Sequence, residues 1–299
     1  LVMLGGWIFM AAHQVMPISV PVLAVTLTYI AITFYEYWRA WRTLGRFIGP
    51  DMLRQILCGT ILPLHLGGRE EEATAFVCDL RGFTGATEQM PLDALSHLTN
   101  EYTSTLVDVV KHHQGRPIDY QGDGAFVLFE RPLAGKDYAE KAVRAALEMQ
   151  EVFQDLQRTW AEAGVPGLEA GIGIATGTLM VGLVGAEDYM KPGAQGDAVN
   201  VAAHVQCLSR TAGYNVLITR DTYARVRETV AATYIYCGSH VVKGRKQPVE
   251  IYGVVSPRAA ADIPDNISPQ EDILDESTQH ALILDATENP TPPTKVATS

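Results

Sequence analysis

The apolar positions divide the chain into an N-terminal apolar stretch, a central region with regular patterns, and a polar tail. From Leu1 to Tyr35 there is no Asp, Glu, Lys or Arg, and Val, Leu, Ile, Ala, Thr and Tyr dominate residues 18–35. A bilayer span takes ~20 such residues, so we expect a transmembrane segment within residues 1–36, with a buried core helix as the alternative. The sequence begins inside this run with no positive segment before it, so we expect a fragment or an unusual start codon rather than a signal peptide.

Basic and aromatic residues follow this stretch directly. They are Tyr37, Trp38, Arg39, Trp41, Arg42, Arg46 and Arg54. Positive residues stay on the cytoplasmic side of a membrane, and aromatic rings collect at its surface. The pattern therefore predicts a chain held in the cell (inner) membrane, with everything downstream in the cytoplasm.

A juxtamembrane linker is predicted over residues 37–68. Tyr37, Trp41, Leu44 and Ile48 recur at spacings of four, three and four, which places one apolar stripe along a short helix ending before Gly49-Pro50. Such a stripe either pairs two chains or lies on lipid, and it is too short to distinguish a coiled coil from an interfacial helix.

Residues 69–256 alternate between strand and helix patterns. The predicted strands cover residues 73–78, 117–120, 125–129, 168–176, 179–184 and 216–219, with further strands ending at 254; the predicted helices cover about 92–115, 137–164, 197–211 and 221–228. Strand, helix, hairpin, helix, strand is the order of a ferredoxin-like βαββαβ fold, and the tight turn at Gly122 requires antiparallel neighbours. We therefore predict an α+β domain with an antiparallel sheet.

Composition and charge limit the function classes. The 299 residues are 47% hydrophobic and 19% charged, which is ordinary for a globular protein. The net charge of −11 gathers partly in residues 257–299, which hold eight acids and two bases and are predicted to be disordered. No basic surface for nucleic acid is indicated. The four cysteines show no metal-ligand spacing, which is typical of a reducing compartment.

Two aspartates stand at the ends of apolar strands. Asp79 follows the strand at 73–78, and Asp123 lies between glycines just before the strand at 125–129. Paired carboxylates so placed can hold two divalent ions, and ions ~3.5–4 Å apart clamp the attacking and leaving oxygens of a phosphoryl displacement. By itself, Gly-Asp-Gly is as well explained by a tight hairpin turn.

Several motifs in order carry a family resemblance. They are residues 73–84 (ATAFVCDLRGFT), 122–124 (GDG), 171–177 (GIGIATG), 196–203 (GDAVNVAA) and 242–244 (VKG). Together they resemble the catalytic domain of class III nucleotidyl cyclases over residues from about 69 to 254. The resemblance implies an enzyme that converts a nucleoside triphosphate into a 3′,5′-cyclic nucleotide and pyrophosphate.

The resemblance also assigns roles to individual residues. Asp79, Asp123 and the backbone of Leu80 match the ligands of two Mg²⁺ or Mn²⁺ ions. The N–H groups of Arg81, Gly82 and Phe83 match a phosphate cradle. Asn200 matches the residue that orients the ribose, and Lys243 matches the triphosphate-binding lysine; the family supplies these groups from the partner subunit, so a homodimer is implied.

The positions that read the base depart from the family pattern. Adenylyl members carry lysine where this chain has Asp119, and Asp or Thr where it has Gly193. An ionised carboxylate only accepts hydrogen bonds, which favours guanine, cytosine or uracil over adenine. Cyclases of anti-phage systems that make cyclic UMP or cyclic CMP lack these readers too. Our hypothesis is a pyrimidine nucleotide, with Tyr120 near the base, ahead of GTP.

His204 stands where the family has an arginine that stabilises the transition state. A histidine of pKa ≈ 6.5 is mostly neutral at pH 7, and losing such an arginine costs ~10³-fold or more in rate. Three alternatives remain open: a slow enzyme, an enzyme whose bound triphosphate protonates His204, and an inactive dimerisation module.

Overall fold

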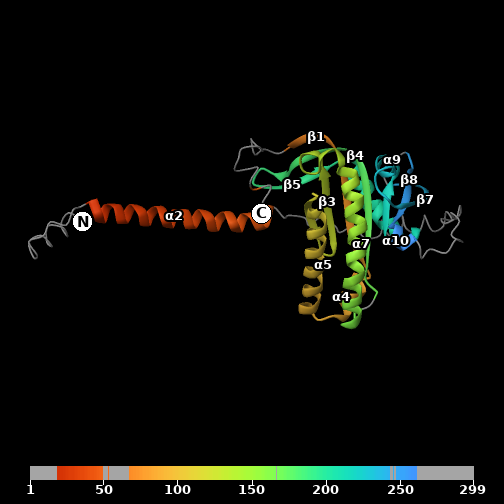
Figure 1. Ribbon diagram of the computed structural model, residues 1–299, viewed down its shortest axis with the longest axis horizontal. Helices are drawn as coiled ribbons and strands as arrows, with labels where there is room; N and C mark the ends of the chain where they lie inside the picture. The colour runs from red at the N-terminus through yellow and green to blue at the C-terminus, as the bar shows by residue number, and fades with distance from the viewer. Residues whose placement is uncertain are drawn as a thin grey trace, which may run out of the picture. The chain divides into compact units, whose positions relative to one another are not determined.

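The computed structural model describes residues 19–49, 53, 67–165, 167–242, 245 and 247–260 (Figure 1). These residues fall into two compact units. One is drawn from Leu1–Gly68 and Gly182–Pro192, and the other from Arg69–Val181 and Gly193–Ser299. Each unit is described by itself below.

Helix α2 (Ser19–Ile48) is the main element of the first unit. Its Val, Leu, Ile and aromatic side chains are largely exposed, and in the part of the chain that the structure describes, Val20–Arg46 is the one helix long and apolar enough to cross a membrane. The predicted apolar stripe from Tyr37 onward lies on a helix, as expected, and this helix is the C-terminal part of α2. The helix ends before Gly49, whose φ of 81° is left-handed. The rest of the predicted linker lies largely outside the described residues.

An eight-stranded sheet organises the second unit, and residues 67–68 and 182–192 of this sheet belong to the first unit. Its strands are β1 (Gly67–Arg81), β2 (Arg116–Gln121), β3 (Gly124–Glu130), β4 (Glu169–Ala186), β5 (Tyr189–Gln195), β6 (Val216–Thr219), β7 (Thr233–His240) and β8 (Val249–Val255). The order across the sheet is β2-β3-β1-β4-β6-β8-β7, and β5 pairs with β4. Pairs β1–β3, β2–β3, β6–β8 and β7–β8 are antiparallel. The β4–β6 pair is parallel, which corrects the expectation of a wholly antiparallel sheet; α8 makes the crossover that this pairing requires.

The helices are α4 (Phe83–Gln89), α5 (Leu92–His112), α6 (Arg131–Ala134), α7 (Tyr138–Glu162), α8 (Asp197–Ala212), α9 (Arg220–Val226) and α10 (Pro257–Ala260). The succession β1, α5, β2, β3, α7, β4 and the order β2-β3-β1-β4 confirm the predicted ferredoxin-like βαββαβ core. Helix α10 takes up the start of the predicted disordered tail, and residues 261–299 lie outside the described part.

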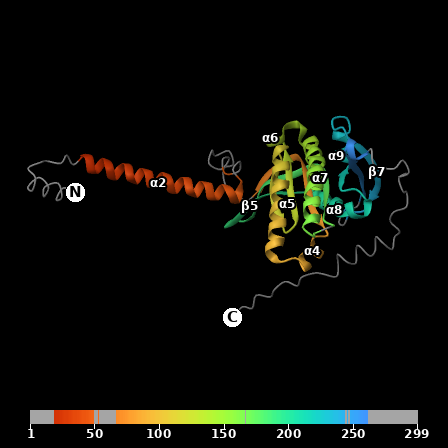
Figure 2. The ribbon, with the colours of Figure 1, turned by 60° about the horizontal axis from the view of Figure 1, so that its bottom comes forward.

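The sheet is buried on both faces. Helices α5 and α7 run side by side over one face (Figure 1 and Figure 2). Alternate residues of β1 serve the two sides: Phe76 and Cys78 join the core under α5 and α7, whereas Ala73 and Ala75 join the core under α8. This alternation follows from the period-2 geometry of a strand, and it places Asp79 on the same side of β1 as Ala75.

Residues 168–186 differ from the prediction. Two strands were expected, with a break at residues 177–178, but β4 runs through both without interruption. The buried hydroxyl of Thr176 is within hydrogen-bond distance of the hydroxyls of Thr74 (2.8 Å) and Thr222 (2.9 Å). These neighbours hold β4 within the sheet directly beside residues 177–178, where the break was expected. Strand β5 was not predicted.

Gly173 sets how closely α8 packs on β4. A Cβ at this position would lie 2.3 Å from the carbonyl oxygen of Ala202 and 2.3 Å from the backbone nitrogen of Gln206, both on α8. Because both neighbours are backbone atoms, no side-chain rotation relieves the clash.

We expect Gly173→Ala to lower the free energy of unfolding by roughly 3 kcal/mol or more, because overpacking against backbone forces α8 off the sheet. Chemical denaturation followed by circular dichroism measures this change. The matched control is Gly85→Ala on α4, where a Cβ meets nothing within 4 Å and helix propensity favours alanine by about 1 kcal/mol. Equal stability of the two variants would contradict the close packing.

Candidate active site

Asp79 and Asp123 come together where β1 ends and β3 begins. Antiparallel pairing sets Cys78 opposite Ala125, which brings Asp79 beside the turn that holds Asp123. A Cβ on Gly124 would lie 3.3 Å from Asp79 Oδ1, so the glycine leaves room for this carboxylate. The two aspartate side chains are close enough to share a hydrogen bond. Two strands distant in sequence thus bring two carboxyl groups into contact.

This pair has unusual electrostatics. Burial raises the pKa of Asp79, and the charge of Asp123 and the hydrogen bond with it raise it further, to about 6. Burial also raises the pKa of Asp123. Two half-buried carboxylates in contact repel each other unless a proton or a cation lies between them. The oxygen-only donor set and this excess negative charge fit a hard divalent cation such as Mg²⁺ or Mn²⁺.

The segment after Asp79 turns sharply into α4. The Leu80 side chain is buried in the core, which leaves its backbone as the group available to a ligand. Gly82 has a φ of 84°, and a Cβ there would lie 2.8 Å from the carbonyl oxygen of Gly167. The first helical bond runs from the Ala86 N–H to the Gly82 carbonyl at 3.2 Å. The N–H of Phe83 precedes this bond and is one of the donors at the start of α4.

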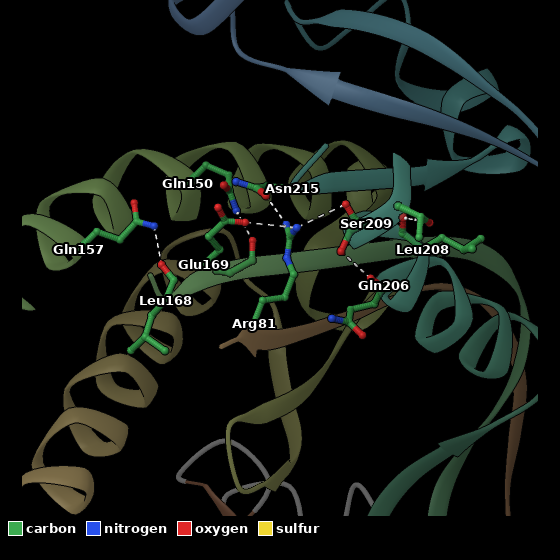
Figure 3. Close-up of polar contacts among 11 residues, drawn as sticks. Arg81, Gln150, Gln157, Leu168, Glu169, Gln206, Leu208, Ser209 and Asn215 are labelled. Atoms are coloured by element: carbon green, nitrogen blue, oxygen red, sulfur yellow. Dashed lines mark hydrogen bonds and ion pairs between the residues drawn. The ribbon is translucent and has the colours of Figure 1, made fainter. Parts of the chain in front are cut away.

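The Arg81 side chain is engaged within the fold (Figure 3). Its Nη1 lies 3.2 Å from Glu169 Oε2 and donates to the Ser209 carbonyl oxygen at 3.4 Å, while Nη2 donates to Asn215 Oδ1. Its Nε is buried with no hydrogen-bond partner among the described residues. Arg81 therefore ties the end of β1 to the start of β4 and the end of α8, and only its backbone remains for the predicted phosphate contact.

Asn200 and His204 lie one turn apart on α8. Asn200 is exposed and His204 is half-buried. Burial lowers the pKa of His204, and nearby His240 lowers it further, against an opposing hydrogen bond with the Val241 backbone. His204 is therefore neutral at pH 7 in this structure.

The remaining predicted residues lie on the sheet or outside the described part. Asp119 and Tyr120 are neighbours on β2, where the Tyr120 N–H donates to Asp119 Oδ1 at 3.2 Å and the Tyr120 side chain is 43% exposed. Gly193 lies on β5. Lys243 lies outside the described residues.

Arg210 is a residue that sequence reasoning missed. It is exposed on the last turns of α8, and its charge acts to lower the pKa of Asp79. No motif contains it. Its proximity to Asp79 depends on how α8 lies across the sheet, which a linear pattern does not reveal.

The family model of the adenylate and guanylate cyclase catalytic domain matches residues 68–256. The chain belongs to this family. Members act on nucleoside triphosphates, use divalent metals and typically form dimers, so the predictions of a nucleotide cyclase domain and of a divalent-metal enzyme are confirmed at that level.

Named relatives support the same family. The cyclase chain is 32% identical over 194 residues to adenylate cyclase 1 of Rhizobium meliloti, which covers 64% of this chain and 29% of that protein. The adenylyl cyclase CyaB from P. aeruginosa has a similar solved structure, with 29% identity, a TM-score of 0.59, and coverage of 64% of this chain and 97% of that chain. The guanylyl cyclase Cya2 matches with 30% identity, a TM-score of 0.57, and coverage of 68% and 100%. The chain thus spans less than a third of the curated relative.

The raised pKa of Asp79 predicts how metal binding depends on pH. Protons compete for this carboxylate below about pH 6, so the affinity for Mn²⁺ should fall by about tenfold per pH unit there and be nearly constant above about pH 7. Isothermal titration with Mn²⁺ across this range measures the change. In Asp79→Asn, binding should be lost while the metal-free cyclase melts at a higher temperature above pH 6, since the repulsion is gone. The matched control Asp155→Asn, an exposed aspartate of α7, should change neither, and an Mn²⁺ affinity independent of pH would contradict the prediction.

Proposed function

We propose that the protein is a membrane-anchored nucleotide cyclase that works as a homodimer, makes a 3′,5′-cyclic nucleotide and releases pyrophosphate. The observation that carries this proposal is the contact between Asp79 and Asp123 at adjacent strand ends, in a chain of the cyclase family. Carboxylates in such contact are costly in a protein that does not use them. A metal-dependent reaction explains why both are present.

In this proposal the chain binds and positions the triphosphate, and the bond changes take place within the substrate. Asp79, Asp123 and the Leu80 backbone hold two Mg²⁺ or Mn²⁺ ions, which when bound supply Lewis-acid stabilisation to the triphosphate and to the ribose 3′-hydroxyl. The N–H groups of Arg81, Gly82 and Phe83 orient phosphate oxygens. The 3′-oxygen then attacks the α-phosphorus in line, its proton is lost to solvent, and pyrophosphate leaves.

The partner subunit completes the site in this proposal. Asn200 orients the ribose and Lys243 binds the triphosphate, and both come from the other chain of a head-to-tail dimer. Helix α2 holds the dimer at the inner membrane with the catalytic domain, residues 69–256, in the cytoplasm. Exposed apolar side chains along Val20–Arg46 support the membrane part of the proposal.

Asp119 is proposed to select the base, with Tyr120 beside it. Gly193 stands at the second position where family members contact the base, and it offers no side chain there. An ionised carboxylate at Asp119 accepts hydrogen bonds, which uracil N3–H, cytosine N4–H₂, and guanine N1–H and N2–H₂ can donate. We rank UTP and CTP ahead of GTP, and a pyrimidine product would fit a second messenger of anti-phage signalling. The relatives named adenylate and guanylyl cyclases support the purine alternatives.

A catalytically impaired dimerisation module is the second candidate. The neutral state of His204 supports it, because a neutral imidazole stabilises developing negative charge poorly. Arg210 offers a compensating positive charge within the same chain, close enough to affect Asp79.

The decisive experiment uses membranes from cells that express the full chain. Incubation with each of the four ribonucleoside triphosphates and Mn²⁺ should release a cyclic nucleotide from the pelleted membranes, with UTP or CTP preferred and ATP the poorest. Asp79→Ala should abolish the reaction. Co-expression of Asp79→Ala chains with Asn200→Ala chains should restore part of the activity, because a mixed dimer keeps one site with both residues. Cyclisation of ATP alone would overturn the base assignment, and no product from any triphosphate would favour the impaired module.

We expect His204→Arg to raise turnover at pH 7 by at least tenfold, because arginine stays protonated where His204 is neutral. Initial rates at saturating triphosphate measure the change. The matched control is His97→Arg, a histidine on α5 away from these groups. If His204→Arg leaves the rate unchanged while Arg210→Ala lowers it, the charge comes from Arg210 and the role of His204 is refuted.

A further inference from the structure

Two adjacent histidines at the end of α5 face one glutamate of α7. His112 is the last residue of α5, His113 caps the helix, and Glu148 lies within α7. His112 Nδ1 lies 3.3 Å from both carboxylate oxygens of Glu148, and His113 Nε2 lies 2.7 Å from Oε2, so both nitrogens are near the same oxygen. One ligand atom from each of the three side chains lies within 4.8 Å of the others. Three side chains that commonly bind metals thus converge from two helices.

The separations fit a small transition-metal ion. Tetrahedral zinc with Zn–N bonds of ~2.0–2.1 Å keeps neighbouring ligand atoms about 3.3 Å apart. The distance from His112 to Glu148 already has this value, and the contact from His113 needs to open by about 0.6 Å, which a rotation of the carboxylate provides. Two imidazole nitrogens with one carboxylate oxygen favour zinc-like ions over Mg²⁺, which prefers oxygen ligands.

The backbone around the histidines is held in place. The His113 N–H donates to the Val109 carbonyl at 3.2 Å, and the Gly115 N–H donates to the Val110 carbonyl at 2.7 Å. Gln114 between them adopts a left-handed φ of 62°. The His113 side chain is 16% exposed and the Glu148 side chain 34%, whereas His112 is 72% exposed. The cluster therefore has two restrained members and one open side toward solvent.

Glu148 is available as an anionic ligand. Its carboxylate oxygens lie within 3.3 Å of ring nitrogens of both histidines, and the structure gives this side chain no other ion pair among the described residues. The neighbouring imidazole rings have centroids 5.0 Å apart and are inclined by 47°, so they point different nitrogens, Nδ1 and Nε2, at the same carboxylate. Neither ring blocks the other.

We propose that His112, His113 and Glu148 form a binding site for one transition-metal divalent cation of the Zn²⁺ type, distinct from the Asp79–Asp123 pair. The ion binds two histidine nitrogens, one Glu148 oxygen and solvent. It ties α5 to α7, the two helices that lie side by side over one face of the sheet (Figure 2). Strand β2 begins at Arg116, shortly after His113, so the ion also fixes the origin of the strand that leads to the Asp123 turn.

The test uses the full chain purified in detergent, stripped with a chelator and kept in millimolar Mg²⁺ to occupy oxygen-ligand sites. Addition of Co²⁺ should give visible absorption bands of a nitrogen-ligated, four- or five-coordinate ion at one equivalent, and Zn²⁺ should abolish them. Zn²⁺ should also raise the melting temperature, because the three preformed ligands of the folded state bind it more tightly than the unfolded chain does.

Matched variants separate this site from ordinary ion pairs. His112→Ala removes an exposed ligand and Glu148→Gln keeps a hydrogen-bond acceptor without the charge, so both should fold and should lose Zn²⁺ affinity at least tenfold. His97→Ala, on the same helix, should bind like the unaltered chain. The proposal is overturned if the Co²⁺ bands are absent, or if either cluster variant keeps the full affinity. Because metal binding is the readout, the result is independent of whether the chain cyclises any nucleotide.

Discussion

The antiparallel pairing of β1 with β3 is the constraint on which the candidate site depends. Because Cys78 lies opposite Ala125, the carboxyl group that ends β1 meets the turn that begins β3. A shift of this register by one residue would send Asp79 to the face covered by α5 and α7 and separate it from Asp123. Buried side chains on both faces of β1 oppose such a shift. The core therefore fixes the register, and this register brings the two aspartate carboxylates close enough to repel each other.

A second constraint is the contact of α8 with the sheet. Gly173 lets the α8 backbone approach β4, and Arg81 joins the end of β1 to the Ser209 carbonyl near the end of the same helix. The helix that carries Asn200 and His204 is thus tied to the strand that carries Asp79. In the proposed dimer, this link would connect the proposed metal ligands of one site to the residues proposed to bind ribose in the other. The charge of Arg210 reaches Asp79 through the same arrangement.

The sequence patterns predicted the features that depend on residues close together along the chain. The spacing of Leu98, Tyr102, Leu106 and Val109 predicted α5 because these side chains form one buried face. Asp79 and Asp123 were found because each stands at the end of an apolar strand pattern. The break at residues 177–178 was predicted wrongly, because β4 continues through them and the adjacent Thr176 hydroxyl is held within the sheet by Thr74 and Thr222 from other elements. The Arg81 network, the nearness of Arg210 to Asp79 and the lowered pKa of His204 depend on tertiary neighbours for which no sequence spacing is diagnostic.

Helix α2 has a mechanical consequence. Its 30 residues span about 45 Å at 1.5 Å per residue, whereas the hydrocarbon layer of a bilayer is about 30 Å thick. A stretch of about 15 Å, or roughly three turns, would then project as a stiff lever beyond the lipid. In the proposed membrane-anchored protein, torsion or piston movement within the membrane would be carried along this helix to its end at Ile48, next to the left-handed backbone of Gly49.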